Sequence, residues 1–401
     1  MADAGTAPRR PKVRSATVAV VALFLLNGFA NGVFLPFAPA ILASRGFDAS
    51  GIGVLGALVS VGTLVLAGWW GHMADVVLGR GRAFAVALGI GMVLLLVFQV
   101  VQPPLLVGAA YVVFLAFYAL VFPLQDALAV NALSEPDRQY GIVRGLQSGA
   151  FALTSFGLGL VWASTGYGPA VLTMVFLSIP VILVALRVPD VERAHLAETT
   201  GRGGAIREAL TVAPRLPRLL LAIGLAHAGV FGTLTFLPLL ILRLGAGPGQ
   251  IGMAAAITAA IEVAGLPLAA RLLGRFGPRP VMTAGIVLMA VTYSWFALAP
   301  SADHVLLASV LYGVGWSGMW AGSVASVRGL LPPPLQGSGQ TLVSLTTGGA
   351  AALAANVGGG LLWDGAGPMV VFGLFAVCAV LGSVVAWTSV PDRLVVEPAA
   401  V

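Results

Sequence analysis

Long apolar runs separated by short polar segments make up nearly the whole chain. Each run approaches or exceeds the roughly 20 apolar residues that an α-helix needs to cross a bilayer. The runs cover 16–42, 51–71, 83–102, 104–133, 141–164, 168–187, 218–242, 250–273, 280–299, 304–328, 338–363 and 366–390. The first run is longer than a signal-peptide core, and no small-residue cleavage pattern ends it. The pattern predicts an all-α membrane protein with twelve transmembrane helices.

The longest polar stretch divides these runs into six and six, which predicts two pseudo-symmetric six-helix bundles. In chain order, the predicted parts are an N-terminal tail (1–15), an N-terminal bundle (16–187), a linker (188–217), a C-terminal bundle (218–390) and a C-terminal tail (391–401). Within the linker, residues 207–218 fit two interpretations, a short amphipathic helix on the membrane surface or a solvated connection.

An internal repeat supports this division. Four residues recur with the same spacing 199 positions later: Pro39, Gly46, Ile52 and Gly53 become Pro238, Gly245, Ile251 and Gly252. The same offset takes Arg80 to Arg279. Parallel six-helix repeats are a known transporter design, with the substrate site near the midplane between the halves. Neither a channel nor a membrane enzyme gives a reason for this duplication.

Composition and charge fit the same class. Hydrophobic residues make up 59% of the chain and charged residues 9%, whereas soluble domains carry about 25% charged residues. If the N-terminus is inside, only Arg45 and Arg243 of the 21 Lys and Arg residues fall on the outer side. This asymmetry predicts that both tails are cytoplasmic and that the chain lies in the cytoplasmic membrane. The excess of basic residues that gives the net charge of +6 then lies on the cytoplasmic face of the membrane. We therefore expect the lipid bilayer, and no nucleic acid, as a partner.

Metal, cofactor and ATP chemistry are not indicated. The one cysteine, Cys378, lies in an apolar run, and the four histidines lack ligand spacing. The chain contains no phosphate-binding loop of the P-loop type. A membrane enzyme or a scaffold would need clustered catalytic groups or a large soluble domain, and neither is visible. We therefore expect a transporter that is not an enzyme.

The loop after the second run resembles a signature of the major facilitator superfamily. Residues 71–82 read GHMADVVLGRGR, which is similar to the family pattern Gly-x-Leu-Ala-Asp-Arg-x-Gly-Arg-Arg. The basic residue after the acid is missing, and one extra residue precedes Gly79. The resemblance implies that Asp75 and Arg80 latch neighbouring helices and govern the conformational switch; the alternative is a plain charge pair at a helix end. Arg279 lies in the weaker second copy, which has no acid.

Within the superfamily, the chain looks closest to the group of the lactose and phenylpropionate permeases. Three stretches carry this resemblance: 31–37 with 46–53, 140–144 after Asp126, and 330–340 with 358–364. The family resemblance implies twelve helices in two bundles, alternating access and a monomer.

Charged residues inside a membrane are costly and mark functional sites. Asp126 in the fourth run and Arg144 in the fifth flank a short loop, so they can approach each other. The resemblance implies that both contact the substrate, where Arg144 would clamp a carboxylate with its planar fork. The alternative is a structural ion pair that locks two helices.

Two further residues are candidates for carrying protons. Glu262 lies midway along the eighth run with no cation adjacent in sequence, and burial favours the neutral form of an acid. His227 in the seventh run titrates near neutral pH when unperturbed. For both residues, a packing role is the alternative. The charged cluster that couples protons on the ninth and tenth helices of the lactose permease is missing here, so coupling would depend on Glu262, Asp126 and His227.

Uncharged residues complete the expected substrate site. Asn27 and Asn31 share a helix face, beside glycines that either line a cavity or permit close helix packing. Gln147 and Phe151 share the face of Arg144, and the resemblance places an aromatic side chain at the position of Phe151. Gln340 is the repeat counterpart of Arg144. Trp316 is expected to seek a polar partner if buried.

The sequence thus predicts a secondary transporter that takes up a small organic solute together with protons. The alternative is proton-driven efflux of a drug-like compound or secondary metabolite, which a cavity rich in aromatic residues and poor in charge would also suit.

Overall fold

The computed structural model describes residues 11–188 and 202–390. Most of the expected N-terminal tail, the first part of the linker and the whole expected C-terminal tail lie outside the described residues. Within these two ranges the chain forms helices joined by short turns, and no strand is present among them. The prediction of an all-α protein is confirmed.

The helices of the first half precede a short helix, α9, that lies in the expected linker. The first half contains α1 (Pro11–Phe34), α2 (Ala38–Ser44), α3 (Ala49–His72), α4 (Arg80–Val100), α5 (Pro104–Ala119), α6 (Val121–Ala132), α7 (Pro136–Thr165) and α8 (Ala170–Ala185). Helix α9 covers Arg202–Val212. It begins before the expected residue 207 and ends before residue 218.

The second half repeats this plan. It contains α10 (Leu216–Arg243), α11 (Pro248–Phe276), α12 (Pro278–Leu298), α13 (Ala302–Leu330), α14 (Gln336–Ser344), α15 (Ala352–Ala366) and α16 (Pro368–Ser389). A π-helical segment, Leu345–Ala351, joins α14 to α15 without a break.

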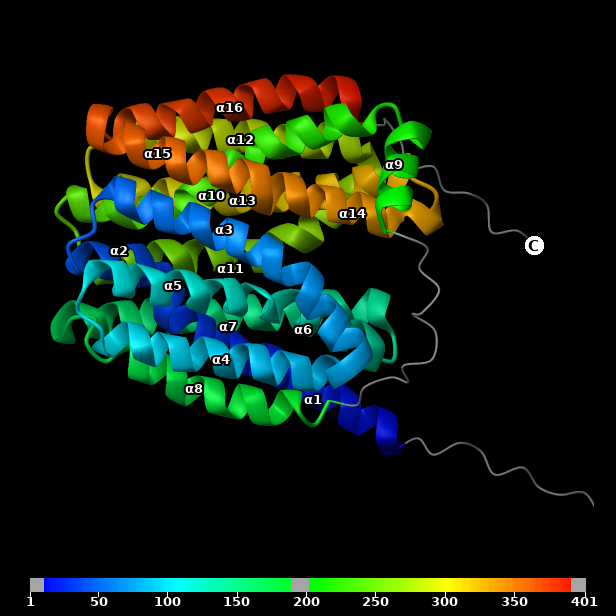
Figure 1. Cartoon of the computed structure of the whole chain (residues 1–401). Helices are drawn as coiled ribbons and strands as arrows, with labels where there is room; N and C mark the ends of the chain where they lie inside the picture. The colour runs from blue at the N-terminus through cyan, green and yellow to red at the C-terminus, as the bar shows by residue number, and fades with distance from the viewer. Residues whose placement is uncertain (1–10, 189–201, 391–401) are drawn as a thin grey trace, which may run out of the picture.

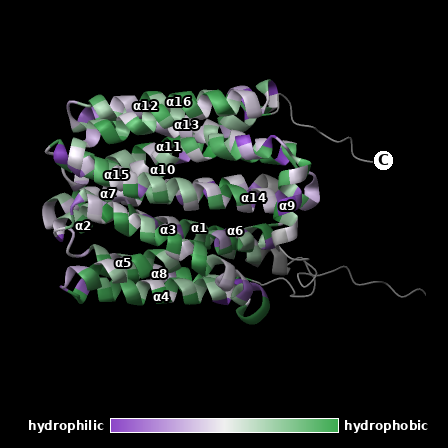
Figure 2. Cartoon of the chain, turned by 45° about the horizontal axis from the view of Figure 1, so that its top comes forward, coloured by the Kyte–Doolittle hydropathy of each residue, from purple (hydrophilic) through white to green (hydrophobic). Residues whose placement is uncertain are grey.

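Ten helices of the described chain are long and apolar enough to cross a membrane, judged by length and composition. The segments α1 and α2 form one of them, and α5 and α6 another. Helix α8 is apolar but has only 16 residues. Figure 2 shows hydrophobic residues along most of the helix lengths and many of the hydrophilic residues near the helix ends.

The same turn ends the first long helical segment of each half. Gly46 has a φ of +90° and Gly245 a φ of +78°, a backbone region that glycine enters without steric cost. The N–H of Phe47 donates to the carbonyl of Leu42 at 3.2 Å, and that of Ala246 donates to Ile241 at 3.1 Å. The donor and the acceptor of the second bond each lie 199 positions after those of the first. The sequence repeat is therefore also a repeat in structure.

The two halves lie side by side (Figure 1). They pack across their boundary mainly through α3 against α15 and α7 against α11. We call the end beside α9 the α9 end. The end that carries residues 45–48, 166–169, 244–247 and 365–367 we call the loop end.

Backbone atoms of the two halves touch at the loop end. A Cβ added to Gly159 of α7 would lie 2.9 Å from the carbonyl oxygen of Pro248, which begins α11. A Cβ on Gly360 of α15 would lie 2.9 Å from the carbonyl oxygen of Ala49, which begins α3. Such distances leave no room for a side chain. The loop end is therefore closed in this conformation, because glycines let the helices approach.

A hydrogen bond across the same boundary supports the closure. The N–H of Ser50, at the start of α3, donates to the Asp364 carboxylate of α15 at 2.8 Å. A carboxylate at a helix N-terminus is favourable for both its hydrogen bond and the helix dipole. The contact is exposed to solvent, which limits its strength.

Removing this carboxylate is expected to favour opening of the loop end. In the Asp364→Ala variant, we expect the closed form to lose about two- to fivefold in population relative to the open form. Spin labels at Val54 and Leu361, which are both exposed near this contact, would report the change as a longer distance, in a Cys378→Ser background. An Asp303→Ala variant, on α13, serves as control. An unchanged distance distribution for Asp364→Ala would show that this bond does not hold the loop end shut.

Candidate substrate and coupling site

Asp126 and Arg144 meet inside the N-terminal half. Asp126 lies on α6 and Arg144 on α7, one on each side of the short connection between these helices. Nη1 of Arg144 lies 3.5 Å from Oδ1 of Asp126. The Arg144 side chain is 36% exposed and that of Asp126 is 38% exposed. The pair therefore faces open space, which a structural lock between two packed helices would not require.

Two neighbours on α7 complete the surroundings of this pair. Nη1 of Arg144 also donates to Oε1 of Gln147 at 3.3 Å, and Gln147 lies one turn further along the helix. The Tyr140 hydroxyl lies close enough to the Asp126 carboxylate to act on it. Tyr140 is fixed by an edge contact with Phe24 of α1, with 6.3 Å between the ring centres. Asp126 thus has a hydroxyl as well as a cation in its surroundings.

The second half brings an acid to the same place. Glu262 on α11 is half-buried, and the positive charge of Arg144 lies close enough to act on its carboxylate. The side chain of Trp316, on α13, lies close enough to Glu262 to act on its carboxylate. One guanidinium from the N-terminal half therefore pairs with an acid of its own half, and its charge also acts on an acid of the other half.

His227 lies behind the tryptophan that contacts Glu262. Its ring packs edge-on against Trp316 with 5.8 Å between centres, and Trp320 stacks on Trp316 at 5.4 Å. Nδ1 of His227 lies 2.8 Å from the carbonyl oxygen of Ile223, so this nitrogen carries the hydrogen. Nε2 is buried and has no hydrogen-bond partner among the described residues. His227 is separated from Glu262 by an indole ring rather than joined to it by hydrogen bonds.

The two asparagines of α1 lie inside the N-terminal half. Asn27 donates to the side-chain oxygen of Gln125, and Asn31 accepts from the Tyr118 hydroxyl. Asn27 is fully buried and Asn31 is 5% exposed. In this conformation the face that they share is turned toward α5 and α6, and a role of either residue in lining the substrate cavity stays a prediction.

The glycines beside them serve helix packing. A Cβ on Gly28 would lie 2.9 Å from the Cβ of Ala150, and a Cβ on Gly32 would lie 2.8 Å from the Phe151 carbonyl oxygen. Of the two interpretations offered by the sequence, close packing of α1 against α7 accounts for these two glycines.

Two other expected substrate contacts are less closely connected to the charged residues. Phe151 is half-buried on α7, two turns beyond Arg144. Gln340 is half-buried on α14. Among the described residues, no hydrogen bond joins the Gln340 side chain to Arg144 or Glu262, so the structure does not bring it into this cluster.

The expected switch residues lie at the α9 end, Asp75 and Arg80 in the first half and Arg279 in the second. Nε of Arg80 donates to Oδ1 of Asp75 at 3.1 Å, across the π-helical segment Met73–Leu78 and Gly79. Nε of Arg279 donates to the Val390 carbonyl oxygen at 3.0 Å. Arg279 therefore connects the start of α12 to the end of α16.

The residue types in this site can bind a polar solute and accept a proton. A guanidinium, two carboxylates, an amide and a hydroxyl supply hydrogen-bond donors and acceptors, while Trp316 and Trp320 offer flat apolar surfaces. No group of three or more His, Cys, Asp or Glu side chains with metal-binding geometry occurs in the part of the chain that the structure describes.

Sequence reasoning did not single out Tyr140 and Gln125 as site residues. Tyr140 precedes Arg144 by four residues, a spacing that places both on one helix face, so this signal was available. Gln125 is completely buried, and nothing in its local sequence indicates that it accepts from Asn27, 98 positions away.

Comparison with known proteins identifies similar sequences and similar folds. A family model described as the MFS_1 like family matches residues 19–374. The maltose permease of Geobacillus stearothermophilus is 24% identical over 376 residues, which cover 90% of this chain and 91% of the permease.

Solved structures share the fold at low sequence identity. A mutant of the nucleoside transporter NupG aligns with a TM-score of 0.82 and 16% identity, covering 93% of this chain and 99% of that chain. A bacterial homologue of the human lysosomal transporter Spinster, in an inward-facing and unoccupied conformation, aligns with a TM-score of 0.72 and 14% identity. It covers 95% of this chain and 98% of its own.

Proposed function

The chain belongs to the MFS_1 like family, and from this premise we propose that it is a proton-coupled symporter for a small polar organic solute. Membership in this family and the similarity to a maltose permease make the chain a secondary membrane transporter and not an enzyme. The proposed assignment adds twelve spans, both tails in the cytoplasm, a cytoplasmic-membrane location and a monomer.

The observation that carries the proposal is that the charge of Arg144 acts on two acids. Asp126 belongs to the same half as Arg144, whereas Glu262 belongs to the other half. When the halves move relative to each other, the distance from Arg144 to Glu262 must change, and the cost of a charged Glu262 changes with it. Proton uptake by Glu262 is therefore linked to the conformation of the transporter, and solute binding at Arg144 acts on the same equilibrium.

A sugar or a related hydroxylated compound fits the site best. Hydroxyl groups can accept from Arg144 and donate to Asp126 or Glu262, and Trp316 can stack on the apolar face of a sugar ring. The relationship to a maltose permease supports this class. In this proposal Arg144, Asp126, Gln147 and Trp316 bind the solute and Glu262 carries the proton.

The remaining expected residues keep their proposed roles around this centre. Asp75, Arg80 and Arg279 form the switch at the α9 end, Phe151 and Gln340 contact the solute in other conformations, and His227 assists coupling. Asn27 and Asn31 position α1 through their hydrogen bonds within the N-terminal half.

A pH recording tests the direction of transport. Weakly buffered, de-energised cells that overproduce the protein would receive sugars, aryl acids and hydrophobic cations one at a time. Alkalinisation of the medium with one compound, absent in vector cells, is expected for symport. The stacked Trp316 and Trp320 favour efflux of an aromatic compound as the second candidate, and that function predicts no alkalinisation and reduced retention of the compound.

Replacing the proton carrier is expected to uncouple transport. With Glu262→Gln, we expect the accumulation ratio of the solute to fall to about one, because a carrier without a coupled proton only equilibrates its solute. Exchange of labelled for unlabelled solute should persist. A Glu208→Gln variant on the exposed α9 serves as control. Accumulation at the parent level by Glu262→Gln would remove Glu262 from the proton pathway.

A further inference from the structure

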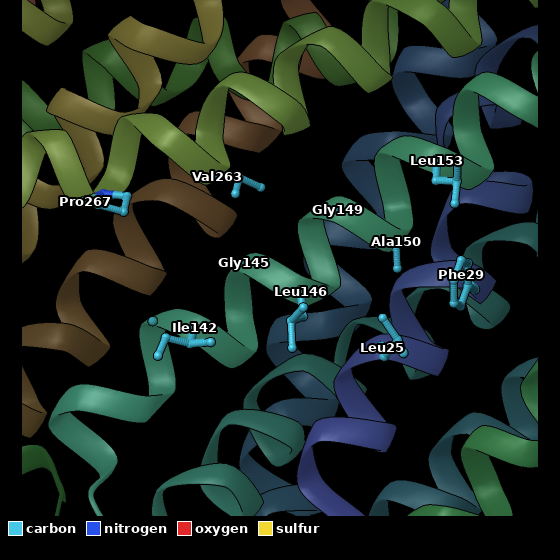
Figure 3. A pocket seen from close by; sticks show the side chains of 11 residues that line it. Leu25, Phe29, Ile142, Gly145, Leu146, Gly149, Ala150, Leu153, Val263 and Pro267 are labelled. Atoms are coloured by element: carbon cyan, nitrogen blue, oxygen red, sulfur yellow. The ribbon is translucent and has the colours of Figure 1, made fainter. Parts of the chain in front are cut away.

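A cavity separate from the charged site lies between the two halves near the α9 end. It has a volume of about 590 Å³ and is lined by parts of α1, α7 and α11 (Figure 3). Leu25 and Phe29 of α1 lie on one side, Gly145 and Gly149 of α7 form the floor, and Val263 and Pro267 of α11 lie opposite. Every lining residue is apolar or a glycine. We call this cavity the lateral groove.

Three glycines create the depth of the lateral groove. Gly141, Gly145 and Gly149 follow one another at four-residue spacing on α7, so they form a strip along one side of the helix. A Cβ on Gly141 or Gly149 would have no atom within 4 Å, and one on Gly145 would only meet Val263, at 3.9 Å. The glycines are therefore not required for helix contact in this conformation. They leave a channel of about 12 Å along α7, from a rise of about 1.5 Å per residue.

The lateral groove opens away from the polar cluster. Arg144 and Gln147 lie on the opposite side of α7, because successive residues are rotated by about 100°. On the groove side, Ile142 is 62% exposed and Leu153 is 65% exposed. Large apolar side chains with this exposure belong on the surface that faces lipid. The length of the channel is close to one leaflet of a hydrocarbon core, which is about 15 Å.

A basic residue, Arg271, follows the last lining residue of α11 in the lateral groove. Arg271 follows Pro267 by one turn on the same side of α11 and is exposed. No ion pair of Arg271 occurs among residues 11–188 and 202–390. Arg271 lies toward the α9 end, where basic residues collect and where the positive-inside rule places the cytoplasmic leaflet. That leaflet carries the anionic phospholipids in many membranes.

We propose that the lateral groove binds one anionic phospholipid, with an acyl chain along the glycine strip and the phosphate on Arg271. The chain would bury Gly145 and Gly149 on one side and Val263 and Pro267 on the other. Because these residues belong to different halves, the lipid holds α7 and α11 apart at the α9 end. It therefore binds the present conformation better than one in which this end is closed, and it shifts the equilibrium toward the present conformation.

Two variants distinguish a lipid bound in the lateral groove from the lipid that surrounds any membrane protein. Gly149→Leu puts a side chain into the channel at a position where an added Cβ meets no atom within 4 Å, and Arg271→Gln removes the proposed headgroup contact. Their matched controls are Gly157→Leu, on the same helix with open space around its Cβ, and Arg218→Gln, an exposed cation at the start of α10. Neither control residue lines the groove.

Native mass spectrometry of the full chain, titrated with phosphatidylglycerol or phosphatidylcholine, measures binding directly. We expect the parent protein to retain phosphatidylglycerol in preference to phosphatidylcholine. Arg271→Gln should reduce its retention about fivefold, which corresponds to the loss of one cation near an anionic surface. Gly149→Leu should also reduce retention, because it occupies the space for the acyl chain, and the controls should not. Equal retention by all five proteins, or equal loss in variants and controls, would overturn the proposal. Displacement of the lipid by inorganic phosphate alone would also overturn it, because the acyl chain would then contribute nothing.

A second measurement tests whether the lipid favours closure of the loop end. It also tests whether the transported solute, rather than a lipid, occupies the groove. In phosphatidylglycerol vesicles, labels at Val54 and Leu361 should stay closer together than in phosphatidylcholine vesicles, and Gly149→Leu should abolish the difference. If Gly149→Leu instead weakens binding of the transported solute and leaves phosphatidylglycerol retention unchanged, the groove accepts an apolar part of the solute and the lipid site is excluded. Lipid retention does not depend on transport, so this test can fail while the proposed function stands.

Discussion

Replacing Gly252 by leucine is expected to disfavour closure of the loop end. Gly252 lies one turn into α11, and its missing side chain lets α11 rest directly on α7. A Cβ at this position would overlap the carbonyl oxygen of Ser155 and lie 3.0 Å from Cα of Gly159. Both obstacles are backbone atoms of a continuous helix, so no side-chain rotation can make room. Overpacking of this kind costs about 1–3 kcal/mol, which corresponds to a loss of about 5- to 150-fold in the population of the closed form.

Because transport requires both conformations, this shift is expected to reduce transport by a similar factor. Spin labels at Val54 and Leu361 should move apart, and solute should still bind, since the charged site is untouched. Gly358→Leu is the matched control, because its Cβ has no atom within 4 Å. Normal transport by Gly252→Leu would mean that the loop end need not close tightly.

The repeat explains why much of the fold could be predicted from sequence. Pro39, Gly46 and Gly53 recur as Pro238, Gly245 and Gly252, and the structure uses the two turn glycines in the same way. Apolar runs set the helices, because a long stretch of apolar residues has few alternatives in a bilayer. The approach of Asp126 to Arg144 also followed from sequence, since a short loop between antiparallel helices leaves little choice of partner.

Features that depend on helix rotation could not be predicted in the same way. The periodicity placed Asn27 and Asn31 on one face but did not say which neighbour that face meets. In α1 the apolar residues surround the helix, so hydrophobicity gives no direction, and the hydrogen bonds to Gln125 and Tyr118 decide the orientation. For the same reason, the contact of Trp316 with Glu262 joins helices that no local pattern pairs.

Replacing Arg144 by glutamine is expected to weaken solute binding about 10- to 100-fold. The guanidinium contacts Asp126 and Gln147 and acts on Glu262, so its loss removes the cation shared by both halves. Hydrogen bonds to charged groups contribute about 1.5–3 kcal/mol each, which gives this range. Arg144→Lys should recover only part of the affinity, because an ammonium cannot reproduce the planar fork.

The double variant distinguishes a binding pair from a structural ion pair. If Asp126 and Arg144 only neutralise each other, Asp126→Asn combined with Arg144→Gln should restore solute affinity, and each single variant should mainly lower thermal stability. If both residues bind solute, affinity should fall further in the double variant, while stability changes little, because a pair this exposed contributes about 0–1 kcal/mol. Measuring the dissociation constant and the melting temperature of all four proteins gives the coupling energy in each property. If the coupling energy appears in the melting temperature but not in the dissociation constant, the pair only stabilises the fold. The solute would then need a cation other than Arg144.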